Sequence, residues 1–563
     1  MGAPGWPDFA RSTASTERNL MVLTQSCSMS TEMAGIHSSD GTKRRSRDAN
    51  SSQRCIIIGF TIHSHGQGVS RMSHGKRFAT RGSGLALALL AVLLTTHPGC
   101  ATNPATGKRQ ISFVSQNKEL EMGKDADPAI VAEYGLYGDS SLAKYVDGVG
   151  QRVGKASHLP DLEWHYRLLD SPVVNAFAIP GGYIYITRGI LAYMNSEAQL
   201  AGVLGHETGH VTARHTAQQM TQQQIASVGL IAGTIFVPQF RPLGGIAAQS
   251  LGLLFLKYSR DHETQADELG IAYATKAKYD PREIPATYAT LKRIGERQGQ
   301  SIPSFMSTHP DPGDREVRTR QLALASVSST QGDLIIRAPE YRKRIEGLVF
   351  GDDPRAGYFE DNRFYHPDLA FQMILPSGWK TQNLPSALQA ANEGSGAMMQ
   401  VTLGSTKDQS VTPAEYVDSL RARGSVATAT GRTEQFRDFP AWIGTVILQG
   451  QGGQSEFAAG FVRIHPGQFL EVIGQSKAGL ANDEIYQSIR SIAALRDPAK
   501  LNVAPDRLSV QPAKRTATFA TVWSDFGPLA IGVEDGAILN GMRATAEVQA
   551  GTPIKIVTKG KGR

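Results

Sequence analysis

The chain has 563 residues, of which 40% are hydrophobic, 19% are charged and only 3 are cysteine. This length exceeds one ordinary hydrophobic core, and the composition excludes a collagen-like, a disulfide-stapled and an acidic disordered protein. The formal net charge of +7 is concentrated in residues 1–99, which hold 11 Lys and Arg against 5 Asp and Glu. Because the remaining chain has 47 basic against 46 acidic residues, its charge argues against a nucleic-acid partner.

Residues 72–99 have the pattern of a secretory signal. A basic segment at 76–81 precedes an unbroken apolar run at 85–94, and small residues then lead to Cys100. This run is too short to cross a bilayer, which takes about 20 residues. The segment resembles a bacterial lipoprotein signal, although His97 stands where a leucine-like residue is usual. We therefore expect a lipid anchor on Cys100.

Residues 1–71 have no sustained helical or strand periodicity. We interpret them as an extension upstream of a true start at Met72, with a disordered N-terminal arm as the alternative. The residue after Cys100 is Ala101, not Asp, which by resemblance to Gram-negative lipoproteins favours the outer membrane. The expected location is thus the cell envelope, with the protein lipid-anchored and facing the periplasm.

The chain after the signal begins with a part, residues 100–345, that is predicted to be mostly helical with a small β element. The strand-like runs at 173–179 and 183–187 are joined by a Pro-Gly-Gly turn signal. Two apolar segments, 225–237 and 243–256, are each shorter than a membrane span. We predict that they are buried core helices, with a hairpin dipping into the membrane surface as the alternative.

Two smaller parts follow. Residues 355–498 alternate strand-like runs with helical patterns and are weakly similar to PsbP-like sandwiches. Residues 505–563 resemble a degenerate LysM-like module. Generic accessory domains are the alternative interpretation for both parts. No internal repeat is visible.

The strongest chemical motif is His206-Glu207-Thr208-Gly209-His210, which has the pattern H-E-x-x-H. Residues four apart lie on the same face of a helix, so both imidazoles can bind one metal ion. Glu207 can then take a proton from a water molecule activated by that ion. The pattern alone is a modest signal, because two structural helix histidines would also produce it.

A pair of carboxylates follows 53 residues after His210. Glu263 and Asp267 are four residues apart, on one face of a predicted helix. Two such carboxylates repel each other unless a cation lies between or beside them. One metal ligand and one acceptor for the N–H of a ligand histidine would satisfy both.

Two further motifs complete a resemblance to a known family. Asn175-Ala-Phe-Ala-x-Pro-Gly-Gly precedes the H-E-x-x-H motif, and His309-Pro-x-x-x-x-Arg315 follows the carboxylate pair. In this order the four motifs resemble the CAAX-prenyl-protease and HtpX-like zinc metallopeptidases, the periplasmic BepA-like branch above all, over about residues 105–330. The membrane spans of other branches and the helical repeat domain of some BepA-like proteins have no counterpart in this sequence.

The resemblance implies a zincin-type protease domain, and the predicted fold class is therefore α+β. It also implies one zinc ion per chain and assigns roles to several side chains. The metal ligands would be His206, His210 and Glu263, and Asp267 would be the supporting carboxylate. Glu207 would be the general base. His309 would lie near the metal, as oxyanion stabiliser or removable fourth ligand, and Arg315 would support it.

Neighbouring residues are predicted to have simpler roles. His215 would lie about 180° around a continuous helix from His206, which makes it a poor ligand for the same ion. His262 is predicted to be exposed. The segment Asn175, Ala176, Phe177 and Ala178 could provide an unpaired strand edge that binds an extended peptide substrate.

These observations predict a zinc-dependent endopeptidase of the bacterial envelope that hydrolyses misfolded or misassembled envelope proteins. The alternatives are a chaperone-like protein that keeps the fold with its site held closed by His309, and an adaptor lipoprotein that acts through its C-terminal modules. The predicted partners are protein or peptide substrates and, through Cys100, a membrane. Outer-membrane assembly machinery and peptidoglycan are further candidates.

Overall fold

The computed structural model describes residues 99–228, 258–298, 309, 312–328, 330–450, 453–476 and 482–561. The predicted signal, the segment before it and nearly all of the two apolar segments lie outside the described residues, so those interpretations stay predictions. No helix in the described part of the chain is long and apolar enough to cross a membrane. A mostly helical part is followed by a β-rich part, which confirms the predicted α+β class.

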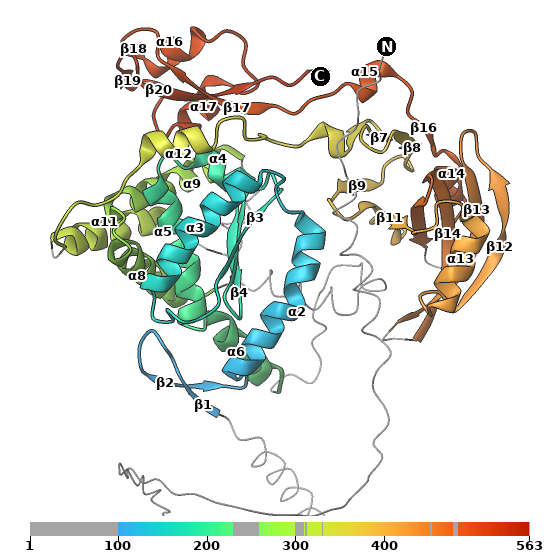
Figure 1. Ribbon diagram of the computed structural model, residues 1–563, viewed down its shortest axis with the longest axis horizontal. Coiled ribbons are helices and arrows are strands. Elements are labelled where there is room, and N and C mark those ends of the chain that lie inside the picture. The colour runs from blue at the N-terminus through green and yellow to red at the C-terminus, as the bar shows by residue number, and fades with distance from the viewer. Residues whose placement is uncertain are drawn as a thin grey trace, which may run out of the picture. The chain divides into compact units, whose positions relative to one another are not determined.

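The first part of the chain is mostly helical and contains a short β-hairpin and a small sheet (Figure 1). Its elements in chain order are β1 (Gly99–Thr102), β2 (Arg109–Ser112), α2 (Gln116–Tyr134), α3 (Ser140–Ala156), β3 (His165–Leu169), β4 (Ala176–Ile179), β5 (Tyr183–Thr187), α4 (Arg188–Tyr193), α5 (Glu197–Thr212), α6 (His215–Val228), α8 (Arg260–Lys276), η4 (Pro281–Glu283), α9 (Ile284–Gln298), α11 (Pro312–Ser328) and α12 (Ala338–Arg344).

The small sheet has the strand order β3-β5-β4. Central strand β5 pairs in parallel with β3 and antiparallel with β4, and it coincides with the predicted run at 183–187. The predicted run at 173–179 forms a strand only from Ala176 onward. Helix α3 packs on this sheet through a row of fully buried valines, Val146, Val149 and Val153.

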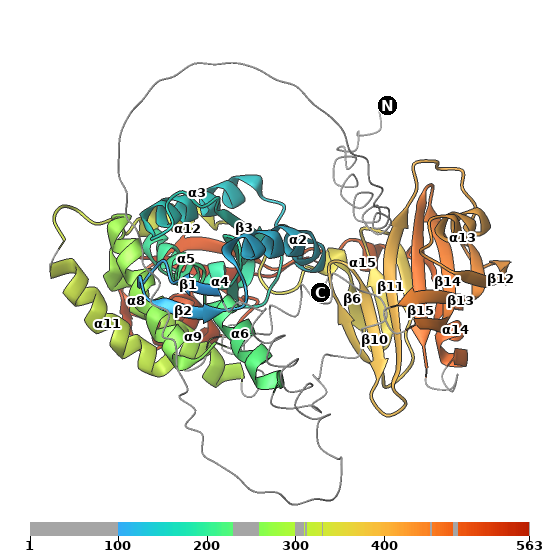
Figure 2. The same ribbon diagram turned by 90° about the horizontal axis from the view of Figure 1, so that it is seen from below.

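The middle part of the chain is rich in antiparallel strands, as Figure 2 shows for β10, β11, β13, β14 and β15. One sheet has the order β12-β13-β14-β15-β11-β10-β9 and another the order β16-β8-β7-β6. The elements are η5 (Pro354–Ala356), β6 (Tyr358–Glu360), β7 (Arg363–His366), β8 (Phe371–Ile374), β9 (Lys380–Asn383), β10 (Leu388–Asn392), β11 (Ala397–Ser405), α13 (Pro413–Ala422), β12 (Thr428–Gln435), β13 (Pro440–Gly450), β14 (Gly453–His465), β15 (Gln468–Gln475), α14 (Asn482–Arg490) and β16 (Ala493–Ala494).

In the last part of the chain, two short helices lie between two paired strands. Strand β17 pairs antiparallel with β20. Lys555 of β20 is fully buried, and its Nζ donates hydrogen bonds to the carbonyls of Ala192 (2.6 Å) and Met194 (2.8 Å), just before helix α5 begins. The elements are α15 (Pro498–Leu501), β17 (Arg507–Pro512), β18 (Ala517–Thr518), α16 (Phe519–Ser524), α17 (Val533–Leu539), β19 (Glu547–Val548) and β20 (Pro553–Thr558).

Candidate metal centre

The H-E-x-x-H motif lies in helix α5, and its side chains are buried in the interior of the protein. Ser196 caps the helix, because its side chain accepts a hydrogen bond from the Gln199 N–H. His206, Glu207 and His210 are 2%, 0% and 1% exposed. Polar side chains buried to this extent need partners within the protein.

Helix α8 brings the two carboxylates to the same place because small residues line its contact with α5. A Cβ on Gly205 would lie 2.9 Å from the carbonyl oxygen of Gly270, and a Cβ on Gly270 would lie 2.8 Å from the backbone nitrogen of His206. Side chains at these positions would force the helices apart. The glycine contact therefore sets the distance at which Glu263 faces the histidines of α5.

Four buried side chains place one ligand atom each within 4.8 Å of all the others: His206, His210, Glu263 and His309. The Nε2 atoms of His206 and His210 are 3.0 Å apart. The Nε2 of His206 lies 3.4 Å from Glu263 Oε2 and 3.4 Å from His309 Nδ1. Ligands bound tetrahedrally at zinc distances lie about 3.4 Å apart, so these side chains fit that ion.

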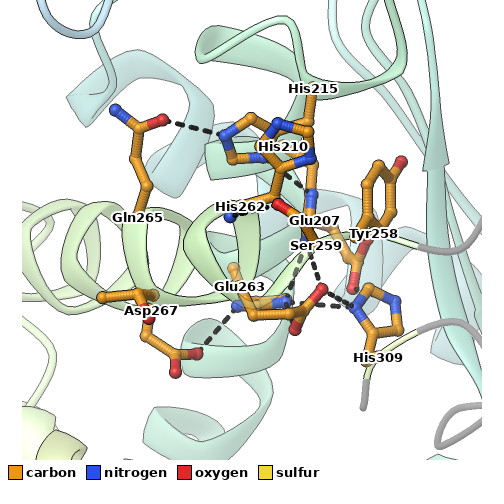
Figure 3. Close-up of polar contacts among 12 residues, drawn as sticks. Glu207, His210, His215, Tyr258, Ser259, His262, Glu263, Gln265, Asp267 and His309 are labelled. Atoms are coloured by element: carbon orange, nitrogen blue, oxygen red, sulfur yellow. Dashed lines mark hydrogen bonds and ion pairs between the residues drawn. The ribbon is translucent and has the colours of Figure 1, made fainter. Parts of the chain in front are cut away.

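Glu207 lies beside this cluster with both carboxylate oxygens buried and without a hydrogen-bond partner among the described residues. Its Oε1 is 3.7 Å from His309 Nε2 (Figure 3). Burial raises the pKa of Glu207 above its ordinary value. A carboxylate in this setting suits a group that exchanges a proton with a ligand entering the cluster.

Arg315 is the cation that keeps the two carboxylates of α8 together. It is 2% exposed, its Nη1 lies 2.7 Å from Glu263 Oε2, and its Nη2 lies 2.7 Å from Asp267 Oδ1. Although burial opposes the effect, His309 and Arg315 hold the pKa of Glu263 well below its ordinary value, and Arg315 does the same for Asp267. The resemblance implied that Arg315 supports His309, whereas the contacts given above run to the two carboxylates.

Asp267 orients the first histidine of the cluster. Its Oδ1 lies 3.0 Å from Nδ1 of His206, which turns the Nε2 of that ring toward the cluster. Burial and Arg315 lower the pKa of His206, but hydrogen bonds to Asp267 and Glu263 outweigh them and raise it to about 9.

His215 orients His210, the second histidine of the cluster, a role that the sequence did not reveal. A hydrogen bond of 3.0 Å joins Nδ1 of His210 to Nδ1 of His215, and the Nε2 of His215 lies 2.9 Å from the amide oxygen of Gln265 (Figure 3). Because the amide oxygen only accepts, His215 donates from Nε2 and accepts from the Nδ1–H of His210. The Nε2 of His210 is thereby left with a free lone pair.

The predicted position of His215, about 180° around a continuous helix from His206, is wrong, because the helix is interrupted before His215. Helix α5 ends at Thr212, and Arg214 has the left-handed φ of 58° before α6 begins. The 180° estimate applies to one continuous helix. His262 was predicted to be exposed, which is also wrong: it is 7% exposed, and its ring stacks on that of His215 at 4.4 Å.

The remaining predicted positions lie on two strands. Ala176, Phe177 and Ala178 belong to β4 and are 0%, 7% and 8% exposed, and Asn175 lies just before the strand. Among the described residues β4 pairs only with β5, so its other edge is unpaired there. Cys100 lies in β1.

Comparison with known proteins accounts for this arrangement. Residues 140–322 match Peptidase family M48. The chain carries an M48 peptidase domain. The match spans every side chain of the cluster, and it confirms the resemblance to zinc metallopeptidases with a BepA-like branch.

Several named relatives share this domain. The mitochondrial metalloendopeptidase OMA1 of Schizosaccharomyces pombe is 32% identical over 222 residues, covering 38% of this chain and 63% of that protein. OMA1 of Arabidopsis thaliana is 34% identical over 194 residues, covering 34% and 38%. The beta-barrel assembly-enhancing protease of Escherichia coli K12 is 29% identical over 231 residues, covering 39% and 47%. The chain thus spans less than two thirds of the length of these relatives.

Proposed function

We propose that the protein is a zinc-dependent endopeptidase of the bacterial cell envelope. The observation that carries the proposal is the buried cluster of ligand atoms at tetrahedral separations, beside which Glu207 has no hydrogen-bond partner among the described residues. His206, His210 and Glu263 would hold the ion. Zinc bound there supplies a Lewis acid for the peptide carbonyl and acidifies water.

The other steps of the reaction depend on residues of the protein, each with a separate role. Glu207 takes the proton of the attacking water and returns it to the leaving amine, and its raised pKa makes it a stronger proton acceptor. Asp267 and His215 fix the orientations of the two ligand histidines. Arg315 balances the charge of Glu263. The edge of β4 that is unpaired among the described residues aligns the substrate through main-chain hydrogen bonds.

The proposed substrates are misfolded or misassembled envelope proteins. Recognition through a strand edge demands an extended backbone more than a sequence, and unfolded chains offer such a backbone. Relatives named beta-barrel assembly-enhancing proteases support a connection with outer-membrane assembly. A lipid on Cys100 would tether the enzyme to the membrane, and residues 505–563 would contact assembly machinery or peptidoglycan.

The test is metal removal from the full-length protein purified from a bacterial host. We expect about one zinc per chain, casein cleavage that a chelator abolishes, and recovery of cleavage when Zn²⁺ is restored. The measurements are elemental analysis and the release of casein fragments. Protein that holds no zinc under metal-replete conditions would contradict the proposal.

His309 supports a second candidate, a protein whose site is held closed. Its Nδ1 is the fourth ligand atom of the cluster, and zinc sites with four protein ligands are typically structural, whereas catalytic sites use three. Such a protein would act as a chaperone or adaptor until His309 moved away.

Substitution of His309 by Ala separates the two candidates. If His309 closes the site, His309→Ala raises the rate of casein cleavage at least tenfold, with the zinc content unchanged because three ligands remain. If His309 instead stabilises the oxyanion, the same variant keeps zinc and cleaves about 10²-fold more slowly. An unchanged rate would argue against both roles.

A further inference from the structure

A pocket opens beside the metal ligand His210. Its walls come from the end of α5, the start of α6, the first turn of α2, the segment before β3 and the turn after β4. His210 and Ile179, the last residue of β4, both line it. A peptide that follows the edge of β4 and reaches the metal ligands therefore passes this pocket with the residues next to its scissile bond.

Two of the residues that line the pocket, Glu119 and Arg214, form a buried ion pair. Arg214 Nε donates to Glu119 Oε2 at 2.7 Å, and Arg214 Nη2 donates to the carbonyl of Val114 at 2.8 Å. Arg214 is 6% exposed and Glu119 is 7% exposed. With a φ of 58°, Arg214 has the left-handed backbone that costs a residue with a side chain about 1–3 kcal/mol, and such strain is often found at functional sites.

Helix α2 reaches this position because glycines permit a close contact with the β4–β5 turn. A Cβ on Gly123 would lie 2.1 Å from the carbonyl oxygen of Pro180, and a Cβ on Gly181 would lie 2.9 Å from that of Glu119. The contact brings Glu119 to Arg214, which lies 95 residues away in sequence.

Each side chain of the pair keeps hydrogen-bonding capacity for a ligand. Arg214 Nη1 and Glu119 Oε1 make no hydrogen bond with other described residues, and both side chains line the pocket. Leu120, Leu159 and Leu162 make the walls apolar. An acidic side chain would be repelled by Glu119, and a basic one by Arg214. Because the ion pair is neutral overall, its attraction does not compensate for the desolvation of either charged side chain.

We propose that this pocket binds the side chain of a substrate residue adjacent to the scissile bond, and that the Glu119–Arg214 pair selects uncharged side chains. A terminal amide, as in Gln or Asn, matches the donor and the acceptor together. This inference rests on the proposed endopeptidase function and specifies the substrates of the same site.

The test compares cleavage profiles on a peptide library by mass spectrometry. For the wild type, or His309→Ala if the wild type is closed, we expect Asp, Glu, Lys and Arg to be depleted at one position flanking the cleaved bond. Glu119→Gln leaves the charge of Arg214 unbalanced. Two peptides that differ only in having Glu or Gln at that position are compared. The kcat/KM for the Glu peptide, divided by that for the Gln peptide, should rise at least tenfold in the variant.

Two further variants keep the test decisive. Leu120 is 41% exposed and lines the pocket, so Leu120→Lys adds a cation without disturbing the buried pair and should also favour acidic side chains. Glu121→Gln, an exposed position on the same helix paired with Lys118, should leave the profile unchanged.

The outcomes separate the two proposals. If the wild type and His309→Ala hold zinc and cleave, but all variants share one profile, the pocket does not select substrates. The specificity proposal also fails if Glu119→Gln slows cleavage of every peptide equally. If neither parent protein cleaves any peptide, the endopeptidase proposal itself is overturned, and the specificity proposal with it.

Discussion

Substitution of Glu207 by Gln should reduce kcat/KM for casein or a peptide by about 10²–10⁴-fold, the usual contribution of a general base. The amide has the shape of the carboxylate but cannot accept the proton of water. Zinc content should be unchanged, because the ligand cluster does not include Glu207. Thermal stability should be equal or higher, because Gln removes a buried carboxylate that has no hydrogen-bond partner among the described residues.

Glu197 provides a matched control on the same helix. It is 1% exposed, and its carboxylate accepts hydrogen bonds from the hydroxyls of Tyr145 and Tyr279 and pairs with Arg152 and Arg337. Glu197→Gln should therefore lower the melting temperature, whereas Glu207→Gln should not. Cleavage retained by Glu207→Gln would place the base elsewhere, and loss of zinc would make Glu207 a ligand.

The grouping of the cluster's side chains could be predicted in part, because helical geometry determines which residues share a face. His206 and His210 are four residues apart, as are Glu263 and Asp267, and the helical period alone places each pair on one face. The resemblance to a known family then indicated that the two helices and His309 contribute to the same site. The physical reason for that contact, the approach of Gly205 to Gly270, is visible only in the structure.

The surroundings of the ligands could not be predicted, because they depend on where a helix stops. Nothing in the sequence marks Arg214 as a residue with left-handed backbone, yet this turn returns His215 to the ring of His210. The burial of His262 follows from its stacking on His215. Glu119 and Arg214 are 95 residues apart in the sequence, and no local sequence pattern indicates that they are in contact.

Substitution of Arg315 by Met should lower the free energy of unfolding by about 3–5 kcal/mol, because it leaves buried charges uncompensated. The side chain fits among Glu263, Asp267 and the ring of Tyr288, whose centroid is 4.4 Å from its Cζ. The zinc affinity should fall as well, since Asp267 and Glu263 lose the cation that orders them. Chemical denaturation of the apo and zinc-loaded forms measures both effects.

The dependence on pH distinguishes this electrostatic role from simple packing. Arg315 lowers the folded-state pKa values of Glu263 and Asp267, so its contribution is present above their unfolded values and is lost as the pH falls. The stability difference between wild type and Arg315→Met should therefore shrink below about pH 4. A difference that stays constant with pH would indicate lost packing alone.

Arg318 provides a control for the effect of burial, because its ion pair with Asp267 is partly exposed. Its Nη2 lies 2.5 Å from Asp267 Oδ2, but its side chain is 31% exposed and water screens the charge. Arg318→Met should thus cost about 1 kcal/mol or less. Arg315→Lys should be intermediate, because one ammonium cannot reproduce the two-sided contact of a guanidinium. Equal losses for Arg315→Met and Arg318→Met would mean that burial does not set the strength of these pairs, and that the carboxylates of α8 are held together by another group.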